Sequence, residues 1–497
     1  MRNIRSTHAP HLNGTRIPCL LYADDIVLLS RAPIGLQSSL NMLQAFCGSQ
    51  GLTVNMKKTQ VVVFNDKNDL ASYVTKELFY YMGTQVDKVE QYTYLGVLFH
   101  RKGDFKAAVD VLAVAARKAM FGMMRRCVSM GITDIKLKCQ LFDTLVLPVL
   151  SYGCEVWGTH YIIDGCEVFE KVHRLFLRKV LGVRKSTANF MLYAEFGRLP
   201  LQFIWQKQIM KFYNRMIELN EAGSIRLLVD AFKWAHEQHA QHTWVAQLQK
   251  WIATTQATMP ESANRAAGGY GNHGGGNSCS SSVGGTDLET QSEHAHPHAH
   301  GYTPLGGGGV PHVSAAASQS RGIPDPTPSP EELDVEELLE SAKLAYMRSN
   351  TVGASRKIHR FVSMHGGNWG TIAEYLTWNI SKKHRMELTR FRLGAHCLEV
   401  ETGRWTGIEF QDRLCPYCKA FGNNCVEDEH HFIFDCPLYH SIRETYQSCY
   451  RNIPRNLFSL FSSKCGAMLA PLIHRCFCKR GDFLSSLQQS REPGLAP

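Results

Sequence analysis

The chain has 497 residues, which is long enough for several domains with substantial cores and excludes a small module held together by disulfides. Lys and Arg outnumber Asp and Glu, and the formal net charge of +10 suits an anionic partner such as nucleic acid, although solubility alone accounts for it equally well. No apolar run is long enough to span a bilayer and the N-terminus lacks the apolar core of a signal peptide, so we expect an intracellular protein without membrane segments.

An acidic pair lies between two short apolar runs near the N-terminus. Residues 17–22 and 26–29 have the length of strands, and Asp24 and Asp25 fall in the turn between them. Adjacent carboxylates repel each other, so between buried strands they are costly unless a cation such as Mg²⁺ neutralises them. Two-metal phosphoryl transfer uses carboxylates held on rigid strands. An ordinary hairpin with an acidic turn is the alternative, because Asp is favoured in turns.

The segments that follow this turn have a recognisable order. Residues 30–51 are expected to form a helix capped by Gly51, the segment 51–60 then leads into a strand over Val61–Phe64, and a Tyr-Leu-Gly run follows at residues 94–96. Together with Tyr22-Ala23-Asp24-Asp25, these segments resemble the third and fourth palm motifs and the primer-grip hairpin of the reverse transcriptases of non-LTR retrotransposons.

The resemblance implies roles for individual residues. Asp24 and Asp25 would bind Mg²⁺, and Lys58 would lie near the incoming triphosphate. Contacts with nucleic acid are implied for the residues of the acidic hairpin and of the primer-grip turn, namely Tyr22, Tyr94, Leu95 and Gly96. Taken alone, Lys58 is a solvated turn charge and the Tyr-Leu-Gly run is an ordinary strand end.

The chain also departs from this family. About sixteen residues precede the first strand, so we expect the fingers, the Gly-rich segment that packs the template and the strand with the third metal-binding Asp to be absent. The nearest upstream segment, residues 8–14, contains no Asp. Metal affinity and the geometry of attack should both fail without that carboxylate. The sequence therefore predicts a chain that does not polymerise by itself.

Basic residues recur in the region after residue 105. A helix is expected over Ala107–Met130, where the family has its thumb, and Arg117 and Lys118 would contact phosphates there. A solvated helix face is the alternative.

Residues 141–158 resemble a Pro-x-Leu-x-Tyr-Gly-x-Glu-x-Trp stretch of the family and are assigned to packing, with Gly153 ending a buried helix. The densest basic segment, residues 171–185, is the best candidate phosphate-binding surface, with Arg174, Arg178, Lys179, Arg184 and Lys185.

A Gly-, Ser-, His- and Pro-rich segment separates the two folded parts. Residues 259–328 have almost nothing to bury and are expected to be a disordered linker. One cluster of its histidines is more simply explained by low complexity than by metal binding, and it consists of His294, His296, His298 and His300. We expect a helix to begin after it, with Ser329 as its cap and Pro330 in its first turn.

One group among the sixteen cysteines has the spacing of a metal site, whereas most of the others stand singly in apolar or helical stretches. Cys415, Cys418, His431 and Cys436 follow the pattern Cys-x2-Cys-x12-His-x4-Cys, and three thiolates with one imidazole suit tetrahedral Zn²⁺. The group resembles the C-terminal zinc-binding region of the same family. Cys425 and His430 are alternative ligands, and a metal-free core is the alternative to the site as a whole.

Upstream of this group, we expect either nucleic-acid contact or helix support from three arginines, Arg390, Arg392 and Arg404.

These features predict an α+β chain with a truncated reverse transcriptase palm, made of a β-hairpin and an α/β part, followed by mostly helical regions. The expected divisions are a partial palm with primer-grip hairpin (1–105), thumb and helical connection (106–220), helical extension (221–258), disordered linker (259–328), helical region (329–412), zinc knuckle (413–440) and partly helical tail (441–497). The resemblance implies RNA-directed DNA polymerase chemistry with Mg²⁺, a structural Zn²⁺, and an RNA template with a DNA primer or target DNA as partners. A nuclear location follows if the chain acts as a retrotransposon protein. The alternative is a non-catalytic nucleic-acid-binding protein or a decayed relic.

Overall fold

The computed structural model describes residues 8–12, 14–64, 76–221, 231, 243–257, 332–366, 369–462 and 466–489. These residues belong to one compact unit, formed by Met1–Met259 together with Glu332–Pro497. The expected linker at 259–328, with its cluster of four histidines between His294 and His300, lies outside the described residues. None of the described helices is both long enough and apolar enough to cross a membrane.

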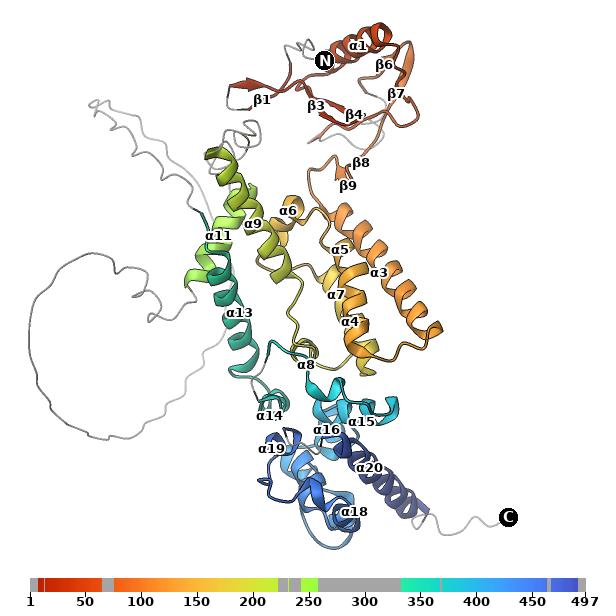
Figure 1. The fold of residues 1–497 in the computed structure, drawn as a ribbon, viewed down its shortest axis with the longest axis vertical. Coiled ribbons are helices and arrows are strands. Elements are labelled where there is room, and N and C mark those ends of the chain that lie inside the picture. The colour runs from red at the N-terminus through yellow and green to blue at the C-terminus, as the bar shows by residue number, and fades with distance from the viewer. Residues whose placement is uncertain are drawn as a thin grey trace, which may run out of the picture. The chain divides into compact units, whose positions relative to one another are not determined.

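Short strands and one helix make up the N-terminal region (Figure 1). The strands β3 (Cys19–Tyr22) and β4 (Asp25–Leu28) pair antiparallel, as do β1 (His11–Leu12) with β2 (Thr15–Arg16) and β8 (Gln91–Tyr94) with β9 (Val97–His100). A three-stranded sheet has the order β5-β7-β6, with β5 (Gln60–Val61), β6 (Phe79–Tyr81) and β7 (Thr84–Lys88). Helix α1 (Pro33–Gln50) packs against β6, and the small core beneath it contains Leu40, Leu43, Cys47, Val61, Phe79, Tyr81 and Val86.

The expected helix and strand of this region are found with different lengths. Helix α1 ends at Gly51, whose φ of +66° is the left-handed conformation that favours glycine, so the predicted cap is confirmed. The predicted strand over Val61–Phe64 is wrong beyond its first residue. Strand β5 pairs with β7 through Gln60 and Val61 alone, because β7 ends at Lys88 opposite Val61. Phe64 has no strand partner and is about half exposed.

Helices form the next region, and their apolar stripes build one core. Helix α3 (Lys106–Ser129) buries Ala113, Ala116, Met120, Met123 and Cys127, which recur at helical spacing, and it packs against α4 (Ile135–Leu145), α5 (Leu147–Leu150) and α7 (Glu167–Leu181). Trp157, Phe169 and Trp205 meet edge to face at ring separations of 5.3 to 5.5 Å. The remaining elements are α6 (Cys154–Trp157), η1 (Gly158–Tyr161), α8 (Asn189–Glu195), α9 (Gln202–Glu221) and α11 (Trp244–Ala257).

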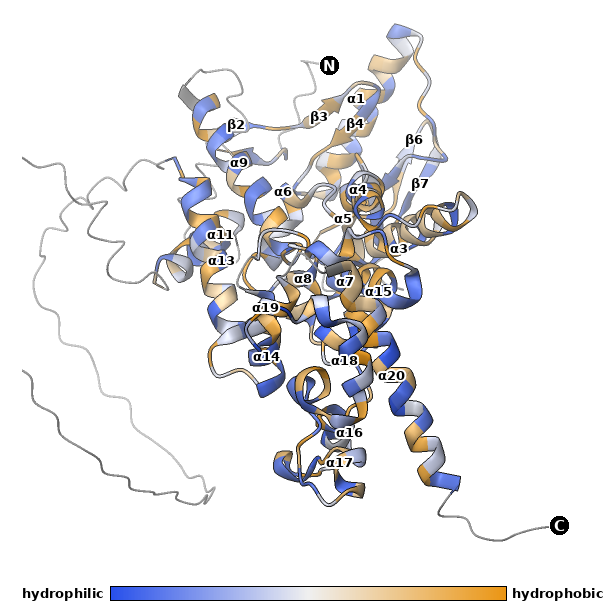
Figure 2. Cartoon of the chain, turned by 60° about the horizontal axis from the view of Figure 1, so that its bottom comes forward, coloured by the Kyte–Doolittle hydropathy of each residue, from blue (hydrophilic) through white to orange (hydrophobic). Residues whose placement is uncertain are grey.

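The C-terminal region is also helical. Its longer helices are α13 (Val335–Thr351), α14 (Arg356–His365), α15 (Lys382–Arg392), α16 (Glu399–Trp405) and α20 (Gly466–Gln489). Helix α20 packs against α15, and Figure 2 shows apolar residues recurring along α20 among polar ones. The short elements are η2 (Glu374–Leu376), η3 (Phe410–Asp412), α17 (Pro416–Ala420), η4 (His431–Asp435), η5 (Pro437–Tyr439), α18 (His440–Thr445), η6 (Gln447–Cys449) and α19 (Leu457–Phe461).

The predicted start of the first helix after the linker is wrong. Helix α13 begins at Val335, and its cap is Asp334, whose carboxylate accepts a hydrogen bond from the backbone N–H of Glu337 at 2.9 Å. Leu333 stays outside the helix because Asn214 of α9 binds both its backbone groups, at 2.7 and 3.0 Å. Local capping residues therefore did not decide this boundary; a contact with a distant helix did.

Candidate metal centres and nucleic-acid interface

The acidic pair lies at a tight turn on an exposed hairpin. Tyr22 pairs with Asp25, so the turn consists of Ala23 and Asp24, and Ala23 has a φ of +49°. Tyr22, Asp24 and Asp25 are all exposed, as is Leu21 on β3 at 53%. The expectation of buried flanking strands is therefore wrong. Since both carboxylates are in contact with water, the turn does not require a cation to be stable.

The described residues around this turn do not complete a metal site. Among them, no third His, Cys, Asp or Glu lies close enough to Asp24 and Asp25 to form a three-ligand group. Lys58 is exposed in the turn at residues 56–58, and its carbonyl accepts a hydrogen bond from the Tyr92 hydroxyl at 3.4 Å. No hydrogen bond or ion pair of the described residues joins Lys58 to the acidic turn. Two carboxylates do not fit a two-metal centre, which needs further ligands.

The turn between β8 and β9 has a strained backbone that a distant tyrosine holds. Leu95 and Gly96 have φ of +47° and +79°, as the tightest hairpins require. The Tyr152 hydroxyl donates to the Leu95 carbonyl at 2.8 Å, and a Cβ added at Gly96 would lie 2.7 Å from the Tyr152 ring. From the sequence, Tyr152 was assigned to packing alone. Its hydrogen bond to Leu95 was not predicted, because 57 residues separate the two partners.

The predicted phosphate-binding residues fall into two groups. Arg117 and Lys118 are exposed on α3, and Lys179 is exposed on α7. The guanidinium of Arg117 lies 5.9 Å from the ring centre of Phe121, and the ammonium of Lys179 lies 5.3 Å from it. The structure thus brings Arg117 and Lys179 together at Phe121, and Lys118 follows Arg117 on the same helix. We call Arg117, Lys118 and Lys179 the α3–α7 basic cluster.

The other predicted contacts are used inside the protein. Arg174 is buried and pairs with Glu167 at 2.6 Å, and Arg178 donates to the Thr187 carbonyl and to Asn189. Both guanidinium groups already donate to protein acceptors, and nucleic-acid contact by Arg174 and Arg178 stays a prediction. Charge density along the sequence did not reveal which cations point inward.

The three arginines upstream of the cysteine group also differ from one another. Arg392 is buried, pairs with Glu195 at 3.0 Å, and lies over the rings of Tyr375 and Phe461 at 5.1 and 4.9 Å. Nucleic-acid contact by Arg392 is therefore wrong, and its role is to neutralise a buried carboxylate. Arg390 and Arg404 are exposed.

The cysteine and histidine group is assembled with metal-site geometry. Cys415, Cys418, His431 and Cys436 place their donor atoms within 4.8 Å of one another. The sulfurs of Cys415 and Cys436 are 3.8 Å apart, and the Cys418 sulfur is 3.4 Å from Nε2 of His431. Tetrahedral Zn²⁺, with bonds of about 2.3 Å to sulfur and about 2.0 Å to nitrogen, separates its donors by about 3.5 to 3.8 Å. The donor set and its spacing therefore fit a structural zinc ion.

The two alternative ligands are placed outside this group. Cys425 lies beside the site, where its carbonyl accepts a hydrogen bond from the N–H of Cys415 at 2.8 Å. Both ring nitrogens of His430 have other partners, Asp435 at 3.0 Å and the Arg455 carbonyl at 2.9 Å. Without a cation, the thiol of Cys436 hydrogen-bonds to Cys415 and lowers the pKa of Cys415 to about 4. That arrangement favours a thiolate at the centre of the group.

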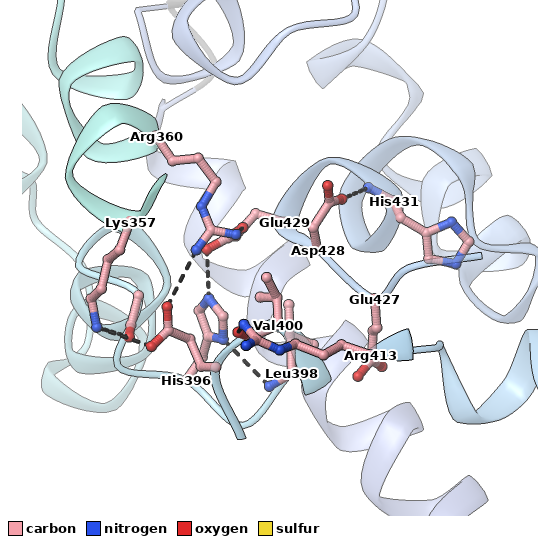
Figure 3. A network of polar contacts seen from close by, with 12 residues as sticks. Lys357, Arg360, His396, Leu398, Val400, Arg413, Glu427, Asp428, Glu429 and His431 are labelled. Atoms are coloured by element: carbon pink, nitrogen blue, oxygen red, sulfur yellow. Dashed lines mark hydrogen bonds and ion pairs between the residues drawn. The ribbon is translucent and has the colours of Figure 1, made fainter. Parts of the chain in front are cut away.

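The three acidic residues before His431 connect the metal group to the surrounding helices. The carboxylate of Glu427 accepts two hydrogen bonds from Arg480 of α20, both at 2.7 Å, and Asp428 accepts from the backbone N–H of His431 at 2.8 Å. Figure 3 shows Arg360 and His396 pointing toward Glu429, with contacts of 2.5 and 3.0 Å. All these partners except His431 lie far away in sequence, so the pattern of letters could not reveal them.

Parts of the chain are similar to known proteins. Residues 1–99 match the family "Reverse transcriptase (RNA-dependent DNA polymerase)". A transposon-derived protein of Caenorhabditis elegans is 28% identical over 258 residues, which cover 50% of this chain and 89% of the nematode protein. A retrovirus-related Pol polyprotein from the type-1 retrotransposable element R2 of Nasonia vitripennis is 30% identical over 105 residues, which cover 20% of this chain and 10% of the polyprotein.

The acidic hairpin and the matching region define the class of the N-terminal part, which is that of reverse transcriptases. The relatives then narrow the class, because both are transposon proteins. The chain is a relative of the reverse transcriptases of non-LTR retrotransposons, as its motifs implied. Nucleic-acid substrates and a divalent metal are the general properties of that class.

Proposed function

We propose that residues 1–497 form a reverse-transcriptase-related polypeptide that binds nucleic acid and does not polymerise by itself. One observation carries this proposal: the described residues assemble a complete four-ligand zinc group, whereas the acidic turn has two carboxylates and no third ligand close by. Two carboxylates are fewer than the ligands of a two-metal centre, so the described residues around the turn supply an incomplete site.

The residues of the proposed palm would act through binding and positioning. Asp24 and Asp25 would contribute two carboxylates to a Mg²⁺ site if another segment supplied the third. Lys58 would lie near the triphosphate. Tyr22 and the turn Tyr94-Leu95-Gly96 would contact the primer. In residues 1–497 alone these groups contribute to binding and not to chemistry.

The α3–α7 basic cluster is the proposed contact for the phosphates of a template and primer. Its cations are exposed, and Phe121 holds two of them on one side of the helix pair. Cys415, Cys418, His431 and Cys436 would hold a structural Zn²⁺. The partners we propose are an RNA template with a DNA primer or target DNA, which places the protein in the nucleus when it acts on chromosomal DNA.

Salt-dependent binding tests this function. The affinity of the full chain for a labelled RNA–DNA template-primer should fall steeply as salt rises, because bound cations are released from each phosphate contact. Arg117→Ala and Lys179→Ala should each reduce the salt slope by about one, whereas Lys250→Ala, an exposed lysine of α11, should leave it unchanged. An affinity that does not depend on salt would overturn the proposal. An equal reduction of the salt slope in all three variants would overturn it as well.

A further inference from the structure

Two basic segments that lie about 200 residues apart in sequence meet at the end of α7. Gly182 ends this helix with a φ of +67°, and a Cβ there would lie 2.6 Å from the Met386 side chain of α15. Arg390, also on α15, donates a hydrogen bond to the Gly182 carbonyl at 3.4 Å. The exposed residues Arg184 and Lys185, which follow Gly182, therefore lie beside the arginines that precede the zinc group.

An exposed tryptophan lies between these segments. Trp405, the last residue of α16, is 53% exposed, and it is the only exposed tryptophan among those that the structure describes. The guanidinium carbon of Arg184 lies over its ring, 5.5 Å from the centre. One face of the indole thus has a cation, which contributes to its position. Large aromatic side chains are usually buried, so an exposed one among cations indicates a binding surface.

The charge on this surface is positive. Among the described contacts, no carboxylate lies within ion-pair distance of Arg184, Lys185 or Arg390. Arg404 pairs with Glu401 at 3.1 Å, but that carboxylate is buried and already shared by Lys357 and Arg360. Arg360 also pairs with Glu429, so the excess positive charge of the surface comes from Arg184, Lys185 and Arg390. Arg184, Lys185, Arg390, Arg404 and Trp405 are called the Trp405 surface below.

We propose that the Trp405 surface binds single-stranded nucleic acid, with a base stacked on Trp405 and the flanking phosphates on Arg184, Lys185 and Arg390. A base in a duplex is already stacked between its neighbours and cannot pair its face with an indole, whereas a base of a single strand can. An exposed aromatic ring can stack on a base of such a strand, and the cations around it can bind the neighbouring phosphates. This inference rests on the proposed nucleic-acid binding and adds a second, single-strand site to the α3–α7 basic cluster.

Fluorescence anisotropy of the full chain with a labelled single-stranded RNA tests the site, with a duplex of the same sequence for comparison. Trp405→Ala should weaken single-strand binding about tenfold and leave its salt slope unchanged, because stacking involves no phosphate. Trp405→Phe should keep most of the affinity. Arg184→Ala should lower the salt slope by about one. Phe421→Ala, at a 65% exposed aromatic residue near the zinc group, is the matched control and should bind like the wild type.

Each outcome decides between the two proposals. Single-strand binding that is the same in Trp405→Ala and the wild type overturns the Trp405 surface alone. Equal losses of single-strand affinity in Trp405→Ala and Phe421→Ala also overturn it, because a general effect on the fold would then explain both losses. The unfolding temperatures of the two variants are measured as a control for such an effect. A wild-type chain that binds neither the single strand nor the template-primer overturns this inference together with the proposed function.

Discussion

At the scale of single residues, burial separates charges that look alike in sequence. Arg174 was expected at a nucleic-acid surface, and Arg392 either there or in support of a helix, yet both are buried and pair with glutamates, Arg174 with the exposed Glu167 and Arg392 with the buried Glu195. Arg117 and Lys179 have the same formal charge but are exposed on one side of a helix pair. The cost of an unpaired buried charge explains the difference, because an inward-pointing cation needs a fixed acidic partner.

The assignment of Arg392 to the fold predicts a large loss of stability when its charge is removed. Arg392→Met should lower the free energy of unfolding by about 3 to 5 kcal/mol, because Glu195 would stay buried without its counter-charge. Arg390→Met, two positions away and exposed, should change it by less than about 0.5 kcal/mol. Denaturant unfolding measures both values. Equal stability of the two variants would show that the Arg392 pair does not hold this core together.

The cysteine group predicts one zinc ion per chain with a structural role. Cys418→Ser should release the metal and lower the unfolding temperature, because zinc-binding free energy becomes folding free energy in such sites. Cys425→Ser is the matched control and should keep its zinc, since Cys425 lies outside the four ligands. Metal analysis and thermal unfolding give the two readouts. A Cys418→Ser protein that is metal-free and as stable as the wild type would contradict the assignment.

Burial of His173 predicts that stability depends on pH. Burial lowers the pKa of His173 below its usual 6.5, although the nearby Glu170 opposes this, and Arg198 and Asp143 also act on the ring. Below that value the unfolded chain takes up a proton that the folded chain does not, so the free energy of unfolding should fall as pH drops from about 7.5 to 5.5. His173→Gln should show a flatter dependence, and His440→Gln, at an exposed histidine, should keep that of the wild type. Identical slopes in all three proteins would refute the role of His173.

At the scale of elements, two hairpins with two-residue turns show how a distant helical segment fixes a turn. The β6–β7 and β8–β9 turns both have two residues with positive φ, Met82 with Gly83 and Leu95 with Gly96. Around Gly83 a Cβ would meet nothing within 4 Å, whereas at Gly96 it would meet the Tyr152 ring. The first turn depends on local conformation alone, and the second also depends on a segment that follows α5.

This difference is measurable with one substitution in each turn. Gly83→Ala should cost about 1 kcal/mol of unfolding free energy, the strain of a Cβ in a left-handed conformation. Gly96→Ala should cost about 1 to 3 kcal/mol more, because the Tyr152 ring must move and its hydrogen bond to Leu95 weakens. Equal costs in the two turns, or a Gly96→Ala effect unchanged in a Tyr152→Ala background, would show that the tyrosine does not position this hairpin.

At the scale of the whole molecule, features set by neighbouring parts of the sequence could be predicted from it. Contacts between residues far apart in the sequence could not. The grouping of Cys415, Cys418, His431 and Cys436 and the Gly51 cap were predicted, because each is set within one continuous stretch of the chain. The ion pair of Arg392 with Glu195 joins residues 197 positions apart, and the bond from Tyr152 to Leu95 spans 57. No local pattern contains such information, and the same reason explains why the late start of α13 was missed.

The central claim is that this reverse-transcriptase-related chain binds a template-primer without extending it. Primer extension on purified residues 1–497 tests it directly, with an annealed RNA template and DNA primer, Mg²⁺ and dNTPs, and an active reverse transcriptase in a parallel reaction. We predict a bound template-primer and no extended product, because the acidic turn lacks a third carboxylate among the described residues. Extension that disappears in Asp24→Ala would contradict the claim and show that Asp24 and Asp25 form a working catalytic centre in this chain.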